Sequence, residues 1–148
     1  MIDWFWRKVA AVATRASIFK WIVESSLATP YYHLKRDAER LYMARYWFFN
    51  GYGTEQHQRR WAFLPSIRVH YIADTDQGPE HNHPWSARSI ILKGWYIESR
   101  EGQVLVREQG STFTLKYGEY HKIVGLSPKG CWTLFIMWKK QGDWGFKG

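Results

Sequence analysis

Three histidines of this chain have the side-chain type and spacing needed to bind a metal ion. His81 and His83 lie two residues apart, so on a β-strand both side chains point to the same face. From a distant strand His121 can supply a third imidazole and leave coordination positions open for chemistry. Neutral imidazoles favour Fe, Zn, Ni or Cu, whereas Mg²⁺ and Ca²⁺ need more carboxylates. We therefore predict a three-histidine metal centre; the alternative is a cluster that has lost its metal.

Three further residues are candidates for the same pocket: Arg68, His70 and Glu98. Residues 67–72 alternate, so Arg68 and His70 share one strand face. An inward Arg68 can bind a carboxylate or phosphate bidentately, whereas an outward one faces solvent. Glu98 can support a ligand histidine, act as a fourth ligand or face solvent, and strand parity does not decide among these. We take these three residues as the candidate catalytic groups.

The elements that must position these residues change character near residue 60. Residues 4–25 carry apolar side chains at helical spacing and predict an amphipathic helix, which packs on the barrel or a partner subunit or lies at a membrane interface. Residues 34–48 are a second, more charged helical candidate. From residue 61 onward the apolar period becomes two, with turn residues between the runs. The strand candidates are residues 67–72, 89–92, 95–98, 103–107, 111–115, 120–124 and 131–138.

These elements predict a mainly β protein, a small antiparallel jelly-roll barrel preceded by two N-terminal helices. We expect residues 1–60 to form a helical extension packed on a barrel of residues 61–148, within one structural domain. Aromatic residues make up 18% of the 148 residues, which suits a small barrel filled by large side chains.

The net charge and the cysteine content limit the classes of function that this chain can have. The net charge of +8 favours a polyanionic partner such as nucleic acid, an anionic lipid surface or a phosphorylated substrate, or it serves solubility alone. Cys131 is the single cysteine, which excludes an internal disulfide and a cysteine-rich zinc site. Basic residues interrupt the N-terminal segment, and no apolar run approaches the roughly 18 residues of a membrane span. We expect no signal peptide, no transmembrane segment and a cytoplasmic location.

The histidine-bearing segments resemble the two motifs of the cupin family. Residues 78–94 resemble the first, G-x5-H-x-H-x3-4-E-x6-G, with a shorter interval between Gly78 and His81, and residues 118–121 resemble the G-x-x-H of the second. Gly94 fits the motif's last glycine, whereas Ala87 stands where the family has its glutamate ligand. Ser89 shares the inward direction of Ala87 and can replace the lost polarity.

A cupin without that glutamate is similar to the three-histidine subgroup, which includes the thiol dioxygenases. This resemblance implies that His81, His83 and His121 hold Fe(II), with Zn, Mn or Ni as alternatives. The stretches at residues 81–85, 92–98 and 144–146 are also similar to short cupin-like proteins of tailed bacteriophages and prophages. That likeness implies a phage origin and, with it, the host cytoplasm as the location.

The resemblances imply an Fe(II)-dependent, dioxygenase-like enzyme that oxidises a small anionic molecule. One rival is a non-catalytic phage binding protein that uses the barrel and the basic N-terminus to engage a host protein, nucleic acid or a membrane surface. Another is a zinc or manganese isomerase or hydrolase that consumes no oxygen. Expected partners are a small-molecule substrate and a second copy of the chain. Trp85 either walls the pocket or packs on the barrel edge, and we assign His33 and His57 no role.

Overall fold

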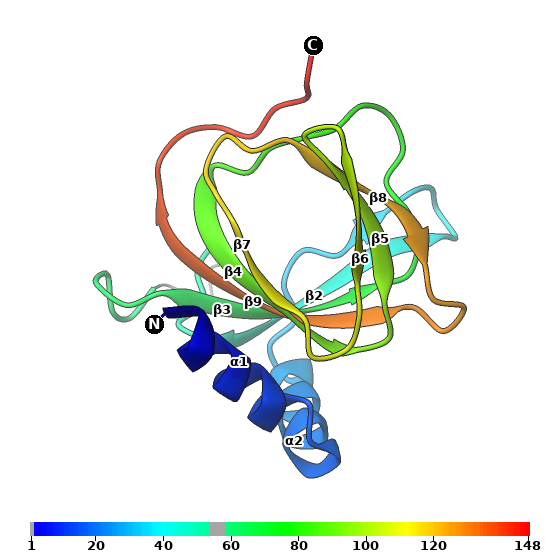
Figure 1. Cartoon of the computed structure of the whole chain (residues 1–148). Helices are drawn as coiled ribbons and strands as arrows, with labels where there is room; N and C mark the ends of the chain where they lie inside the picture. The colour runs from blue at the N-terminus through cyan, green and yellow to red at the C-terminus, as the bar shows by residue number, and fades with distance from the viewer. Residues whose placement is uncertain (1, 54–58) are drawn as a thin grey trace.

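The computed structural model describes residues 2–53 and 59–148, which form two helices and a barrel of antiparallel strands (Figure 1). The helices are α1 (Ile2–Ala13) and α2 (Ala16–Leu27). The strands are β1 (Leu34–Lys35), β2 (Leu41–Phe49), β3 (Ser66–Ile72), β4 (Trp85–Lys93), β5 (Tyr96–Arg100), β6 (Gln103–Arg107), β7 (Thr112–Leu115), β8 (His121–Leu126) and β9 (Cys131–Lys140). The predicted fold class, mainly β with two N-terminal helices, is confirmed, although the bounds of the two helices differ from those predicted. His57 lies outside the described residues.

The strands form two sheets that face each other across the barrel interior (Figure 1). The larger sheet has the order β1-β2-β3-β9-β4-β7, and the smaller one has the order β6-β5-β8. Strand β9 pairs with β3 on one side and with β4 on the other, in a register that places Phe135 opposite both Arg68 and Ser89. Side chains that are distant in the sequence therefore share the inner face of the larger sheet.

Both faces of the larger sheet are covered. One apolar cluster lies inside the barrel and includes Trp47, Phe135 and Met137. A second cluster lies between the sheet and the helices, where Ala10 and Ile22 belong to the same apolar group as strand residues of β3, β4 and β9. Because helices cover the outer face, these three strands carry apolar residues on both sides, and their burial does not alternate cleanly.

The predicted single helix at residues 4–25 is wrong in one respect, because it is two helices. The backbone of Arg15 is extended, with φ −61° and ψ 136°, and α2 begins after it. At the end of α1 the carbonyl of Ala10 accepts two hydrogen bonds from Thr14, one from its N–H at 3.0 Å and one from its hydroxyl at 2.8 Å. The break folds α2 back so that both helices lie on the same sheet face (Figure 1).

The predicted helix at residues 34–48 is also wrong, since this segment contributes β1 and most of β2. Strand β2 pairs with β3 from Met43↔Ile72 to Phe49↔Ile67, with a register shift between Trp47 and Phe49. Ala44 and Trp47 are both buried although they lie on opposite strand faces, because both faces of the sheet are covered. Two buried residues three apart resemble the period of a helix, which explains the wrong prediction. The aromatic residues 46–49 favour a strand instead. Residues 34–49 thus join the larger sheet, and the boundary at residue 60 stays a prediction.

Within the described ranges, neither helix combines the length and the hydropathy that crossing a bilayer requires.

Gly94 provides a test of how tightly the turn between β4 and β5 is packed. Its φ is +83°, and an added Cβ would lie 2.5 Å from the Gly130 carbonyl oxygen and 2.7 Å from the Ser127 hydroxyl. We expect Gly94→Ala to lower the free energy of unfolding by about 3 kcal/mol, from backbone strain plus the clash. The control Gly102→Ala has a similar φ of +79° but no neighbour within 4 Å, and should cost about 1 kcal/mol. Urea denaturation of both variants measures the difference; equal losses would contradict the proposed clash.

Candidate metal centre

The three predicted metal ligands meet at one end of the barrel interior. His81 and His83 lie on an extended segment just before β4 rather than on a strand, and His121 begins β8. The backbones of His81 and His121 exchange two hydrogen bonds of 2.9 Å each. One ring nitrogen from each histidine lies within 4.8 Å of the other two, and the Nε2 atoms of His83 and His121 are 2.9 Å apart. The extended backbone preserves the shared direction that strand geometry predicted.

Glu98 holds His121 in the orientation that a metal ligand needs. Its carboxylate oxygen Oε1 lies 2.8 Å from Nδ1 of His121. With Nδ1 as the proton donor, the lone pair of Nε2 points toward the other two histidines. Glu98 is completely buried, so the interpretation as a solvent-facing strand residue is wrong. Its position supports a ligand rather than a fourth coordination bond.

Two arginines compensate the buried charge of Glu98. Arg100 donates from Nε and Nη2 to Oε1, at 3.1 and 2.8 Å, and Arg107 donates from Nε to Oε2, at 2.8 Å. Burial alone would raise the pKa of Glu98, but the hydrogen bonds from His121 and Arg100 outweigh it and lower the pKa to about 2. Sequence reasoning missed both arginines. The i, i+2 spacing of Glu98 and Arg100 on β5 was an available signal for one of them.

Burial keeps the imidazoles of His81 and His83 in the neutral form. Desolvation lowers the pKa of His83 well below its ordinary value, and the nearby His121 lowers it further. Desolvation also lowers the pKa of His81. Since a metal ion binds the neutral imidazole, these side chains need not lose a proton at neutral pH before they bind.

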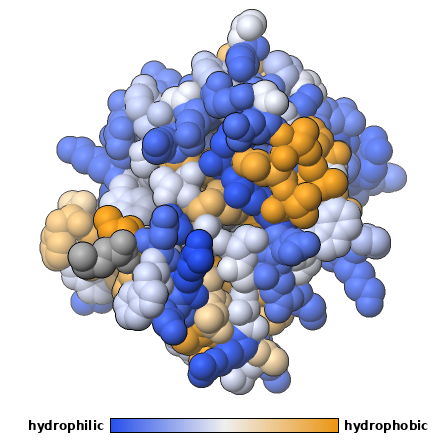
Figure 2. All heavy atoms as spheres, viewed as in Figure 1, coloured by the Kyte–Doolittle hydropathy of each residue, from blue (hydrophilic) through white to orange (hydrophobic). Residues whose placement is uncertain are grey.

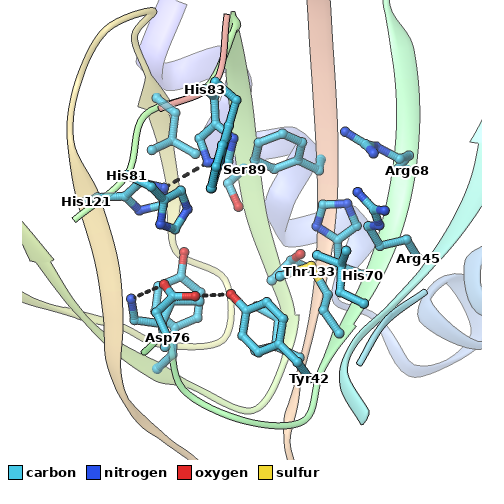
Figure 3. Close-up of a pocket in the computed structure, with 18 of the residues that line it drawn as sticks. Tyr42, Arg45, Arg68, His70, Asp76, His81, His83, Ser89, His121 and Thr133 are labelled. Atoms are coloured by element: carbon cyan, nitrogen blue, oxygen red, sulfur yellow. Dashed lines mark hydrogen bonds between the residues drawn. The ribbon is translucent and has the colours of Figure 1, made fainter. Parts of the chain in front are cut away.

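The histidines open onto a cavity of about 500 Å³ inside the barrel. Arg68, His70, Ser89 and Thr133 line it from the inner face of the larger sheet (Figure 3). Figure 3 shows the histidines on one side of this cavity, with Arg68 and His70 across from them. Arg68 and His70 therefore point into the barrel, which is one of the two directions that the strand alternation allowed. Their catalytic roles stay predictions.

Arg68 is buried without a carboxylate partner among the described residues. It is 4% exposed, and its guanidinium carbon lies 5.2 Å from the Trp47 ring centroid, 5.3 Å from that of Tyr31 and 5.6 Å from that of Trp85. Its Nη2 donates to the sulfur of Met137, at 2.7 Å, whereas its Nε has no hydrogen-bond partner in the described part of the chain. Burial lowers the pKa of Arg68 to about 10, so it stays protonated at neutral pH.

Sequence reasoning missed a polar group at the lower part of the cavity in Figure 3. The hydroxyl of Tyr42 donates to Asp76, whose other carboxylate oxygen accepts the backbone N–H of Ile123 at 2.6 Å. Arg45 lies beside His70 in the same view. Tyr42 and Arg45 belong to the segment that was predicted to be helical, where strand parity could not be applied.

The C-terminal segment fastens the ligand-bearing loop. The backbone N–H of Gly145 donates to the side-chain oxygen of Asn82, at 2.8 Å, and the Asn82 N–H donates to the Gly145 carbonyl, at 2.9 Å. Trp144 and Phe146 line the cavity beside His81. These contacts hold Asn82, which lies between the candidate metal ligands His81 and His83. The sequence did not indicate this role for the C-terminal segment.

The remaining predicted residues also have defined positions. Ala87 is fully buried on the inner face of β4, and Ser89 follows it with the same direction into the cavity. Trp85 lines the cavity and also packs on the inner apolar cluster, so both interpretations describe it. His33 accepts the backbone N–H of Arg45, at 3.0 Å, and is not a cavity-lining residue.

The contact between Glu98 and His121 predicts a role in metal affinity. We expect Glu98→Gln to weaken metal binding by roughly 10- to 100-fold, because the ring loses the carboxylate that orients it. Isothermal titration with Zn²⁺ or with anaerobic Fe(II) measures the change. Glu108→Gln, at an exposed position just beyond β6, is the matched control. If both variants stay folded and bind metal equally, Glu98 does not position the ligand.

Comparison with known proteins yields matches in structure only. No protein-family model matches the chain, and no curated protein matches its sequence. A cupin-2 domain protein from Rhodospirillum rubrum is similar in structure, with 14% identity and a TM-score of 0.59 over 79% of this chain and 74% of that one. A cupin 2 conserved barrel domain protein from Rhodopseudomonas palustris has 13% identity and a TM-score of 0.58 over 81% and 76%.

The DMSP lyase DddQ from Ruegeria pomeroyi is also similar, with 16% identity and a TM-score of 0.57 over 77% of this chain. The match spans 55% of that lyase and 53% of another structure of DMSP lyases. At such low identities the likeness concerns the fold, and it agrees with the two-sheet antiparallel barrel described above. The chain therefore has the jelly-roll barrel fold of the cupins.

Proposed function

We propose that this protein is an Fe(II)-dependent enzyme of the three-histidine cupin type that oxidises a small anionic molecule with molecular oxygen. The observation that carries the proposal is the convergence of three imidazoles on one point, with Glu98 hydrogen-bonded to the ring of His121. His81, His83 and His121 would hold the ion. When bound, Fe(II) supplies the redox chemistry that oxygen activation needs.

The donor set fits such an ion. The Nε2 atoms of His83 and His121 are only 2.9 Å apart, so if both were protonated their N–H groups would point at each other. Two unprotonated Nε2 atoms can instead direct their lone pairs at one shared cation. The negative charge of Glu98 is already balanced by its ion pairs with Arg100 and Arg107, in addition to its contact with His121. Three neutral ligands leave the charge of a divalent cation uncompensated, which favours an anionic substrate.

The opposite side of the cavity supports the same substrate class. Arg68 carries a protonated guanidinium group, and its Nε is a buried donor without a partner among the described residues. The indole N–H groups of Trp47 and Trp85, the two rings beside it, are likewise unpaired there. Buried donors without acceptors cost stability, and a carboxylate or phosphate supplies the acceptors that they lack.

The cavity therefore has two sides with different tasks. The histidines lie on one side and Arg68 lies across from them (Figure 3). An anionic group bound at Arg68 would hold the rest of the substrate toward the histidines and so fix its orientation. Burial lowers the pKa of the nearby His70 well below its ordinary value, so this imidazole is neutral and can accept or donate a hydrogen bond.

Two other functions remain as alternatives with specific support. The names of structures with this fold include lyases and a polyketide cyclase, so a zinc or manganese enzyme that consumes no oxygen is one. The other is a non-catalytic binding protein, supported by the net charge of +8. A phage origin and a location in the host cytoplasm also stay predictions from the sequence resemblance.

Metal content and oxygen uptake distinguish these functions. We expect anaerobic loading to give about one Fe(II) per chain in the wild type and none in His83→Ala, because two imidazoles bind too weakly. The control His33→Ala should bind as the wild type does. Oxygen uptake is then followed while small carboxylates and phosphates are screened. Metal binding without oxygen uptake for any of them would favour the non-oxidative enzyme. Failure to bind any transition metal would overturn the enzyme proposal.

Arg68 should contribute to binding at the expense of stability. We expect Arg68→Met to raise the free energy of unfolding by about 1 kcal/mol, since it replaces a buried, unpaired charge with an apolar side chain. The same change should weaken binding of succinate or inorganic phosphate by about tenfold or more. Urea denaturation and tryptophan fluorescence titration measure the two effects.

The matched control is Arg60→Met, an exposed arginine whose guanidinium carbon lies 4.8 Å from the ring centroid of Trp61. It should change neither quantity. If anion binding by Arg68→Met equals that of Arg60→Met, Arg68 does not bind the substrate.

A further inference from the structure

The two N-terminal helices leave large apolar side chains exposed to solvent. On α1, Trp4 is 65% exposed, Phe5 53% and Val12 45%, and on α2, Trp21 is 58% exposed. The helices are held to the barrel through other residues, such as Ala10 and Ile22, which are buried in the apolar cluster of the larger sheet. Part of the apolar surface of α1 is therefore buried against the sheet, and part of it stays exposed to solvent.

An apolar groove runs between the two helices. Val9, Val12 and Ala13 of α1 line it together with Ile18 and Ile22 of α2, and Leu134 of β9 lies among them. Its volume is about 390 Å³, and among the described residues Lys8 is the one charged side chain that lines it. Phe5 lies one helical turn before Val9 on the same side of α1, so the groove continues into exposed aromatic surface.

The same helix pair carries basic groups without acidic partners. Arg7, Lys8 and Arg15 are exposed and form no ion pair within residues 2–53 and 59–148. The two acidic residues of the helices are already paired. Asp3 lies 3.3 Å from Arg88, and Glu24 lies 3.7 Å from Lys20. The helix pair thus presents exposed cations beside tryptophan and aliphatic side chains.

We propose that the pair of helices α1 and α2 docks on the surface of an anionic phospholipid bilayer. Arg7, Lys8 and Arg15 would contact the headgroup phosphates, while Trp4 and Phe5 enter the interfacial region beside them. The charge decides against a second copy of this chain, which would bring the same cations together. Nucleic acid would satisfy the cations but leave the apolar groove exposed to water.

This surface is separate from the candidate metal centre. The helices cover the outer face of the larger sheet (Figure 1). The cavity is lined by residues of the inner face, among them Arg68 and Ser89. Docking through the helices leaves the barrel interior free, so the proposal goes beyond the proposed function and does not depend on it. A second exposed apolar patch, which includes Val104, Val106 and Val124, lies over the smaller sheet (Figure 2).

Sedimentation with vesicles tests the proposal. The full chain is mixed with vesicles of phosphatidylcholine alone, or with phosphatidylglycerol as roughly a third of the lipid. We expect binding to the anionic vesicles only, and its loss at high salt. The double variants Phe5→Glu/Val12→Glu and Arg7→Glu/Lys8→Glu should each weaken binding by about tenfold or more. All four positions are exposed, so the fold should survive, and far-UV circular dichroism checks it.

The control Val104→Glu/Val106→Glu places the same charges on the apolar patch of the smaller sheet and should bind vesicles as the wild type does. Three results would overturn the proposal: no binding to anionic vesicles, equal loss in the control, or dimerisation without lipid that Phe5→Glu/Val12→Glu abolishes. The last would assign the surface to a second copy of the chain. Metal binding should be unchanged in all these variants, so failure of the metal proposal is distinguished from failure of this one.

Discussion

The buried carboxylate of Glu98 links the architecture of the smaller sheet to the candidate metal centre. A charge with no exposed surface must be compensated within the protein, and its partners come from three strands: Arg100 from β5, Arg107 from β6 and His121 from β8. All three strands must therefore be in register before the charge is satisfied. The same arrangement directs the free nitrogen of His121 toward the other two histidines. Packing, electrostatics and ligand geometry thus depend on one side chain.

The larger sheet can carry buried polar groups on its inner face because its outer face contributes a second apolar core. There, side chains such as Ile90 and Leu134 are buried in the cluster that α1 and α2 complete. Apolar burial on that side stabilises the sheet independently of its inner face. The inner face can then carry Arg68 and His70, whose Nε and Nε2 atoms, respectively, lack hydrogen-bond partners among the described residues. Such local costs in a well-packed fold are expected where a ligand binds.

The helices connect this stability argument to the proposed membrane contact. They are needed to cover the sheet, yet their packing uses only one flank of each helix. The other flank keeps Trp4 and Phe5 in solvent beside unpaired cations. A surface that serves stability alone would bury or replace these side chains, since large exposed apolar patches favour association. The cavity and the helix pair therefore lie on opposite faces of one sheet, and the binding proposed for each is independent of the other.

The sequence by itself determined whatever depends on short-range spacing. The interval between His81 and His83 fixed a common side-chain direction, the alternation of residues 67–72 put Arg68 and His70 on one face, and the period of two after residue 61 predicted the barrel strands. Tertiary structure decided the rest, because it depends on contacts between distant segments. Residues 41–49 became a strand through pairing with β3, and burial on both faces hid their alternation. The partners of Glu98 and the inward direction of Arg68 were settled only when the strands assembled around the cavity, since local periodicity does not specify which face is the interior.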